Sequence, residues 1–198
     1  MKNLTILLIV IACTIQCSAQ SKIVNLTDRV GIREADAYYK DVDNNLDPFV
    51  GTWEYSDGST VLRIVLKKEI KYYTGKYYED LIIGEYKYIE NGVEKINTIS
   101  ELNTIYTDQE DHLISGNRIL ENQQRPLCTD CLPNEKRLDL FFGDHINDVG
   151  GDAMLRRTTI DGQEALKAFI KSDPLPRPAG STHKEMFVPD GEYVLIKQ

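Results

Sequence analysis

Cysteine is scarce in this sequence. Only four cysteines occur in 198 residues, and two of them, Cys13 and Cys17, lie within the first 19 residues. A structural zinc site needs four ligands, and no second Cys or His pair stands at a suitable spacing from Cys128 and Cys131. The Cys-x-x-Cys pair lies in a proline-flanked loop, without the helix N-terminus that activates redox pairs. We therefore predict a small disulfide that stiffens a loop between strands.

Long hydrophobic runs are also missing. The apolar run at residues 4–15 is about twelve residues long, whereas a membrane-spanning helix needs roughly 20. A small-x-small triplet follows at 17–19, which is the layout of a secretory signal peptide cleaved after Ala19. The sequence thus predicts a secreted or periplasmic protein with a signal peptide at 1–19. Lipid attachment at Cys17 is the less favoured alternative, because residues 14–16 lack the small side chains of a lipobox.

Basic residues are fewer than acidic ones. The formal net charge is −8, and loss of Lys2 with the predicted signal peptide takes Lys plus Arg from 23 to 22 against 31 Asp plus Glu. An acidic surface repels phosphate backbones and anionic lipid. The charge balance therefore argues against nucleic acid as a partner, and nothing after residue 20 is long and apolar enough to span a membrane.

The familiar catalytic and cofactor motifs are absent. We find no Gly-x-Ser-x-Gly elbow, no His-Glu-x-x-His, no phosphate loop and no dinucleotide fingerprint. The nearest candidate is the loop "FFGDHINDVGGD", in which an imidazole and carboxylates could serve acid–base chemistry or a metal. Its Asp, Asn and Gly are equally typical of an ordinary turn. We predict a protein that is not an enzyme and has no cofactor. The loop residues concerned are Asp144, His145, Asp148 and Asp152.

What the sequence does have is a period of two. In "TVLRIVLKK", Leu62, Ile64 and Leu66 share one face, as in a strand with one buried side. Asn91-Gly92 between alternating residues is a strong hairpin signal, and Asp161-Gly162 predicts another turn. About nine or ten short strands follow in this way, which is typical of a sandwich or barrel. The segment "EALKAFIKS" suits either a strand or a short helix.

The chain divides into a signal peptide at 1–19, a polar arm at 20–47 and a β domain at 48–198. Within the arm, Ala35–Tyr39 could make a short helical turn. Asp41, Asp43, Asn45 and Asp47 alternate as in the front half of a calcium loop. Such a loop wants Gly at its sixth and Glu at its twelfth position, and this chain has Leu46 and Thr52 there. We therefore predict no metal site.

Gly51-x-Trp53 in "FVGTWEY" resembles the first strand of lipocalin-like barrels, in which the indole plugs the closed end and the glycine lets backbone come close. The resemblance implies an all-β fold, an antiparallel lipocalin-like barrel or curved half-barrel of about eight to ten strands. A core tryptophan in some other β domain would give the same three residues.

A second resemblance rests on longer blocks. The segments "LDPFVGTWEY", "YYEDLIIGEYKYIENGVEKINTI" and "FVPDGEYVLIKQ" are similar to a family of exported proteins from flavobacteria and their relatives, known as a domain of unknown function. The similarity covers about Leu46 to Gln198, and "EDLIIGEYKYIENG" is its most specific part. It implies a secreted β-rich domain and brings no assigned activity.

Two functions fit these observations. A barrel of about eight strands can hold one small ligand or be filled by its own side chains. The first case predicts a small apolar or amphipathic ligand, contacted by Trp53, Leu62, Ile64, Leu66, Tyr86 and Tyr88. The alternative is a structural or protein-interaction domain of the cell envelope with a filled core. Its partner, not identified by the sequence, would meet an open strand edge or a face rich in tyrosine, formed by Tyr72, Tyr73, Tyr77, Tyr78, Tyr86 and Tyr88.

Overall fold

The computed structural model describes residues 21–28, 31–124, 127–173 and 184–198 of the chain. The predicted signal peptide and its cleavage site therefore lie outside the described residues. No α-helix occurs in these ranges, and the regular structure is β-strand with short 3-10 turns. None of the helical turns in this part of the chain is long and apolar enough to cross a membrane.

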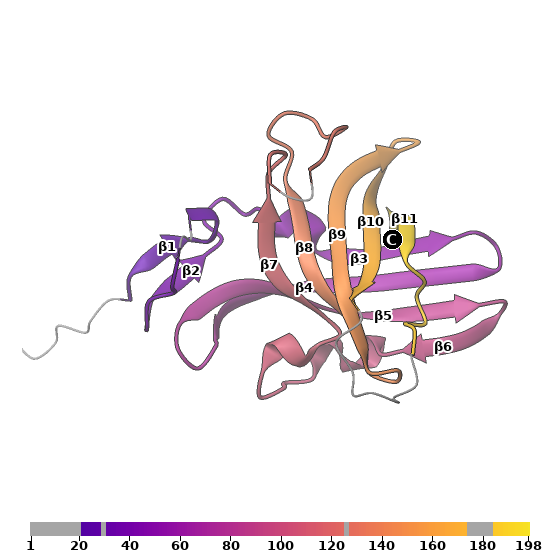
Figure 1. The fold of residues 1–198 in the computed structure, drawn as a ribbon, viewed down its shortest axis with the longest axis horizontal. Helices are drawn as coiled ribbons and strands as arrows, with labels where there is room; N and C mark the ends of the chain where they lie inside the picture. Colours follow the sequence, from indigo (N-terminus) through magenta and orange to yellow (C-terminus); the bar gives the residue numbers. More distant parts are fainter. Residues whose placement is uncertain (1–20, 29–30, 125–126, 174–183) are drawn as a thin grey trace, which may run out of the picture.

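Eight antiparallel strands close into a barrel (Figure 1). The pairing runs β3-β4-β5-β7-β8-β9-β10-β11, and β11 pairs again with β3. The barrel strands are β3 (Gly51–Ser56), β4 (Thr60–Tyr73), β5 (Tyr78–Glu90), β7 (Ile114–Leu120), β8 (Arg137–Asp144), β9 (Val149–Ile160), β10 (Gln163–Asp173) and β11 (Gly191–Lys197). The all-β prediction is confirmed, and of its two forms the closed barrel is the one that forms.

Three further strands extend this sheet along one edge of β5. They are β1 (Ile23–Asn25), β2 (Tyr38–Lys40) and β6 (Val93–Asn97). The edge of β5 is shared: β2 pairs with its start in parallel, β7 with its middle and β6 with its end. The 3-10 turns are η1 (Leu26–Asp28), η2 (Asp47–Phe49), η3 (Ile99–Asn103) and η4 (Gln109–Asp111).

The predicted hairpin turns join the strands as the sequence indicates. Asn91 and Gly92 link β5 to β6 with φ values of 52° and 75°, the left-handed geometry of a type I′ hairpin. Asp161 and Gly162 link β9 to β10. The ambiguous segment "EALKAFIKS" is part of strand β10, and its Leu166, Ala168 and Ile170 alternate into the core. Its period of two therefore prevails over its helix-compatible composition.

The barrel interior is one continuous apolar core. It includes side chains from all eight barrel strands, and residues of the arm such as Leu26, Tyr39 and Leu46 join the same cluster. The turn η2 contacts β9, a strand that does not neighbour β3, so it crosses one end of the barrel. Phe49, within that turn, is buried and closes the end.

The arm is held by a buried carboxylate. The Asp80 carboxylate on β5 accepts hydrogen bonds from the Tyr38 hydroxyl at 2.5 Å, the Asp41 amide at 2.9 Å and the Lys71 amide at 2.9 Å. These bonds fix β2 against β5 in parallel register. The helical turn predicted for Ala35–Tyr39 is therefore wrong. Tyr38 and Tyr39 belong to strand β2, because they pair with β5, which lies about forty residues later in the sequence.

Candidate functional site

The six predicted ligand contacts all lie in the barrel core. Trp53, Leu62 and Tyr86 are fully buried, and the other three are at most 2% exposed. All six belong to one packed cluster of side chains. Four surface pockets in the described part of the chain are lined by other residues. The six residues come together as predicted, and they fill the space that a ligand would need.

Trp53 seals one end of the barrel. Its Nε1 donates a hydrogen bond to the Phe49 carbonyl oxygen at 2.8 Å, so the indole is tied to the turn that crosses the barrel end. The Lys197 ammonium lies 5.4 Å from the indole ring centre. Gly51 has φ of 136°, a value that side chains rarely adopt. In the Gly-x-Trp pattern, Gly51 is needed for its backbone conformation and Trp53 closes one end of the barrel.

The tyrosines do not form one exposed face. Tyr86 is buried, stacks on Phe142 with 4.6 Å between ring centres, and donates its hydroxyl to the Gly143 carbonyl at 2.9 Å. Burial raises the pKa of Tyr86 well above its usual range. Tyr73 is 46% exposed at the far end of β4, where it packs on Tyr78. The predicted cluster therefore separates into core residues and a group beside the arm.

The loop at 144–152 is organised by Asp144. That carboxylate is buried and accepts hydrogen bonds from the amides of Ile146 and Asn147, both at 3.0 Å, and from the Phe187 amide at 2.9 Å. His145 is exposed at the rim of a surface pocket of about 350 Å³. Of the three loop carboxylates grouped with His145, that of Asp144 is therefore occupied in holding the turn and the C-terminal segment.

Two of the alternating acids of the arm, Asp41 and Asp47, contact a lysine. The buried Asp41 carboxylate accepts hydrogen bonds from the amides of Asn45 and Leu46, and from the Lys68 ammonium at 2.9 Å. Lys68 also contacts Asp47 at 2.6 Å. Although burial opposes it, hydrogen bonds to Asp47 and Asp41 raise the pKa of Lys68. The cation at this calcium-like loop is thus an ammonium group of the chain itself.

The structure adds a buried pair that sequence reasoning missed. His112 Nδ1 lies 2.7 Å from Glu85 Oε1, and both side chains are buried on the outside of β5. The Tyr106 ring stands edge-on to the imidazole at 4.8 Å. The pair attaches residues 98–113, the connection from β6 to β7, to the barrel. A Glu on a strand and a His 27 residues later carry no shared pattern, so no sequence signal points to them.

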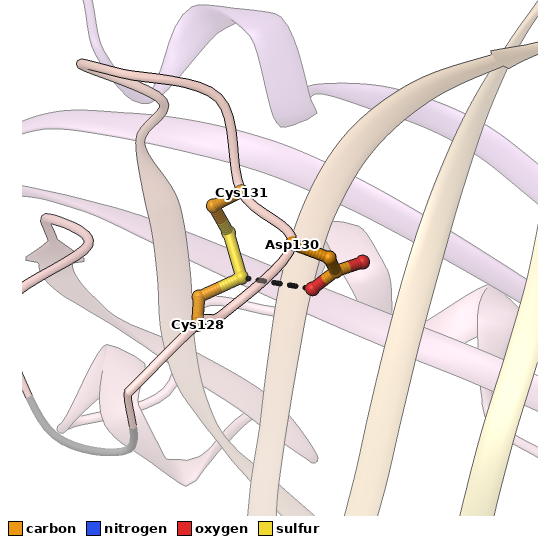
Figure 2. Close-up of side chains that lie close together, drawn as sticks. All are labelled: Cys128, Asp130 and Cys131. Atoms are coloured by element: carbon orange, nitrogen blue, oxygen red, sulfur yellow. Dashed lines mark hydrogen bonds between the residues drawn. A yellow bond between two sulfur atoms is a disulfide. The ribbon is translucent and has the colours of Figure 1, made fainter.

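Polar side chains also lie beside the disulfide. Figure 2 shows Cys128 and Cys131 joined in the loop between β7 and β8, with the Asp130 carboxylate beside the Cys128 sulfur. The two sulfur atoms are 1.97 Å apart, so the predicted disulfide forms. Asp130 Oδ1 lies 3.4 Å from Cys128 Sγ. Because the sulfur of a disulfide carries no proton, this contact between Asp130 Oδ1 and Cys128 Sγ is not a hydrogen bond.

Arg156 on β9 holds this loop against the barrel. Its Nη1 donates to Asp130 Oδ2 at 2.7 Å and its Nη2 to the Asp130 carbonyl at 3.0 Å. Its Nε donates to Glu135 Oε1 at 2.5 Å, and Nη1 lies 3.9 Å from Cys128 Sγ. The hydrogen bond from Arg156 lowers the pKa of Asp130. One guanidinium therefore links the carboxylates of the loop and the sulfur.

The outer barrel wall beside this loop combines apolar and charged side chains. A surface pocket of about 300 Å³ is lined by Leu127, Met154 and Phe169 together with Cys128. Met154 and Phe169 are directly opposed on β9 and β10, and both point outward because their neighbours Leu155 and Ala168 are core residues. We call this surface the disulfide face. Charged side chains of both signs border it, namely Asp130, Arg137, Arg156, Lys167 and Glu192.

A larger pocket of about 570 Å³ lies between the arm and β7. Its two arginines are already compensated, Arg33 by Glu79 at 2.9 Å and Arg118 by Asp139 at 2.9 Å. The guanidinium of Arg33 also lies 4.7 Å from the Tyr77 ring centre. The Arg33 contacts join the arm to the barrel, and the Arg118–Asp139 pair joins the neighbouring strands β7 and β8, so both arginines of this pocket are paired.

Comparison with known families gives one finding. The sequence matches the model of a family of unknown function (DUF6705) over residues 1–198. No curated protein and no solved structure matches the chain. The finding agrees with the predicted domain of unknown function, while its flavobacterial origin and its export stay predictions.

Proposed function

Since the chain belongs to this family of unknown function, DUF6705, we propose from its physical features that it is an exported binding domain with a filled barrel, which recognises a polypeptide partner on its disulfide face. The role proposed is binding without catalysis. The observation that carries the proposal is a pocket on the outside of a packed barrel, lined by exposed apolar side chains and by charged side chains of both signs.

The packed interior supports recognition on the outside. The side chains predicted to contact a ligand are 0–2% exposed and pack on one another. Protein interiors have few voids larger than a water molecule. A ligand inside would have to displace Trp53 or Tyr86, and both are held by hydrogen bonds to backbone carbonyls.

The disulfide face has the anatomy of a polypeptide interface. Leu127 is 65% exposed and Phe169 is 52% exposed, and Met154 lies between the loop and Phe169. Interfaces place aromatic, Met and Arg side chains at the centre of a polar rim. Here the rim carries both signs of charge, which favours a partner chain with mixed polarity over a purely apolar small molecule.

Export is supported by the disulfide. Disulfides persist in oxidising compartments and are rare in the cytosol, and Cys128 and Cys131 are bonded. With the predicted signal peptide at 1–19, we propose a secreted or periplasmic mature chain that begins at Gln20. Mass spectrometry of the protein from its native host tests this, since a lipid-modified Cys17 would give a larger mass.

A peptide-display selection on the mature protein tests the proposed surface. Selected peptides are expected to bind the wild type and to lose about tenfold in affinity against Phe169→Ser, because an apolar side chain loses its buried contact. Phe141→Ser is the matched control, since Phe141 is 47% exposed on the neighbouring outer wall and does not line the disulfide face. Peptides that bind all three proteins equally would overturn the proposed surface.

A further inference from the structure

The Cys128–Cys131 disulfide contributes little to holding its own loop. It closes a ring across three peptide bonds, and the stabilisation from a disulfide falls as the closed loop shortens. Other bonds already fix the loop: Asn122 Nδ2 donates to the Leu132 carbonyl at 2.5 Å, and the Leu132 amide donates to Glu135 Oε2 at 2.7 Å. Arg156 adds its contacts to Asp130. A purely structural role does not account for the pair.

The charged groups around Cys128 would stabilise the thiolate that forms when the disulfide is opened. A neighbouring carboxylate opposes a thiolate and a neighbouring cation favours it. The Asp130 carboxylate is the closer group, at 3.4 Å, but Arg156 donates one hydrogen bond to that carboxylate and one to the Asp130 carbonyl oxygen, and its Nη1 lies 3.9 Å from Cys128 Sγ. The ammonium-bearing Lys167 lines the same pocket. Arg156 pairs with the carboxylates of both Asp130 and Glu135, so Arg156 and Lys167 together offset these two negative charges before another forms on Cys128.

Cys128 lies at the proposed binding surface, the disulfide face. Of the two cysteines, Cys128 lines the pocket formed by Leu127, Met154 and Phe169. A polypeptide bound there would bring its own sulfur to Cys128. Exchange at a disulfide depends on access, on which sulfur is attacked and on the stability of the leaving thiolate. Access favours attack at Cys128, which lines the pocket, whereas stabilisation of the Cys128 thiolate favours the second step, in which Cys128 is the leaving group.

We propose that Cys128–Cys131 is a thiol–disulfide exchange site, whose partner is a polypeptide with two cysteines held on the disulfide face. The proposal rests on the proposed function and names the chemical class of its partner. It assigns attack and attachment to Cys128, the release step to Cys131, and stabilisation of the Cys128 thiolate to Arg156.

The exchange balances without another reactant. A partner thiolate attacks Cys128 Sγ, the Cys128–Cys131 bond breaks, and Cys131 leaves as a thiolate that takes a proton from water. The second partner thiolate then attacks the partner sulfur of the mixed disulfide, and Cys128 leaves as a thiolate beside Arg156. The partner is oxidised by two electrons to a disulfide, and this protein is reduced to its dithiol.

Single-cysteine variants of the mature chain test which sulfur reacts. The probe is an amidated peptide, Gly-Leu-Cys-Phe-Gly, activated as its thionitrobenzoate disulfide. Cys131→Ser, which keeps Cys128, is expected to form the mixed disulfide at least about threefold faster than Cys128→Ser. The peptide is expected to react about tenfold faster than equally activated glutathione, and Phe169→Ser is expected to remove that preference. Equal rates for both cysteines and both probes would overturn the proposal.

Arg156 is tested in the Cys131→Ser background. Replacing Arg156 with Met is expected to raise, by about one unit, the pH at which alkylation of Cys128 reaches half its maximal rate. Arg156→Lys should restore most of that shift, whereas Arg118→Met, which breaks an ion pair outside this face, should leave it unchanged. Circular dichroism verifies that each variant is folded. A pH profile unmoved by Arg156→Met would show that Arg156 does not stabilise the thiolate.

Failure of exchange can be separated from failure of the binding surface. The Cys128→Ser/Cys131→Ser double variant has no thiol, and its affinity for display-selected peptides depends on the apolar surface alone. Retained binding without exchange in the wild type contradicts the exchange site and leaves the proposed function standing. Loss of both contradicts the two together.

Discussion

At the scale of single residues, a few side chains determine how the barrel is filled and closed. Trp53 and Tyr86 are large, fully buried and hydrogen-bonded to backbone carbonyls at different places in the barrel. Sequence alternation correctly indicates that both face inward. It cannot distinguish a cavity wall from a packed core, because that difference depends on how side chains from opposite strands fit together.

Trp53→Ala is expected to lower the free energy of unfolding by about 3–5 kcal/mol, the usual cost of truncating a buried large aromatic. The indole is fully buried and its Nε1 bond to Phe49 is lost as well. Urea unfolding followed by circular dichroism measures this. Leu132→Ala is the control, because Leu132 is 70% exposed and a surface change of this kind stays within about 0.5 kcal/mol. A loss at Trp53 no larger than the control would contradict the packed barrel end.

Buried tyrosines should make the fold sensitive to alkali. Burial raises the pKa of Tyr86, and it raises the pKa of Tyr193 to about 12, whereas tyrosine in an unfolded chain titrates near about 10. Above about pH 10 the unfolded chain loses these protons and the folded chain keeps them. Stability is therefore fully present below about pH 10 and falls as the pH rises toward about 12.

Urea unfolding between about pH 9 and pH 11.5 checks this dependence. Tyr86→Phe is expected to reduce the slope of stability against pH, at a cost of about 1 kcal/mol near neutral pH for the lost hydroxyl bond to Gly143. The exposed Tyr73→Phe serves as control. If the slope is unchanged in Tyr86→Phe, Tyr86 does not remain protonated in the folded state.

At the scale of elements, local signals predict hairpins well and distant pairings poorly. Asn91-Gly92 and Asp161-Gly162 act within a few residues, and both turns form as predicted. The edge of β5 is divided among three strands that come from different parts of the chain. No periodicity encodes that division. For the same reason the local sequence at Ala35–Tyr39 suggests a helical turn that does not form, and the His112–Glu85 pair leaves no signal.

The His112–Glu85 pair should matter more to stability than its surface neighbours. His112→Leu is expected to cost about 3–5 kcal/mol, because it leaves a buried carboxylate without its partner. Replacing both residues with Leu should cost less than this single change, since an apolar pair has no buried charge to compensate. A double-mutant cycle by urea unfolding measures the coupling. Additive losses would show that the two side chains act independently.

The disulfide loop should tolerate loss of its bond. Cys128→Ser/Cys131→Ser is expected to lower the free energy of unfolding by at most about 2 kcal/mol, from the entropy of closing so short a ring. The Arg156 contacts to Asp130 and Glu135 remain in that variant. Thermal unfolding of the oxidised wild type and the double variant makes the comparison. A much larger loss would mean that the bond serves chiefly to hold the fold.

At the scale of the whole molecule, the protein is a closed barrel with a solid core. On our proposal its function resides on the outer surface, where the disulfide face combines exposed apolar side chains with charged ones. The barrel, the disulfide and the six inward-facing residues can all be predicted from the sequence. The disulfide face cannot, because Leu127, Met154 and Phe169 become neighbours only when the loop folds back over β9 and β10.

Native mass spectrometry of the mature protein purified from its own host tests the filled barrel most directly. It is combined with a thermal-shift panel of fatty acids and small hydrophobic molecules. We expect the mass of the bare polypeptide with one disulfide, and no stabilisation by any member of the panel. A stoichiometric small molecule that survives purification would contradict the filled barrel and restore the ligand-binding barrel. Stabilisation by a panel member that is abolished by Ile64→Trp, a substitution inside the core, would do the same.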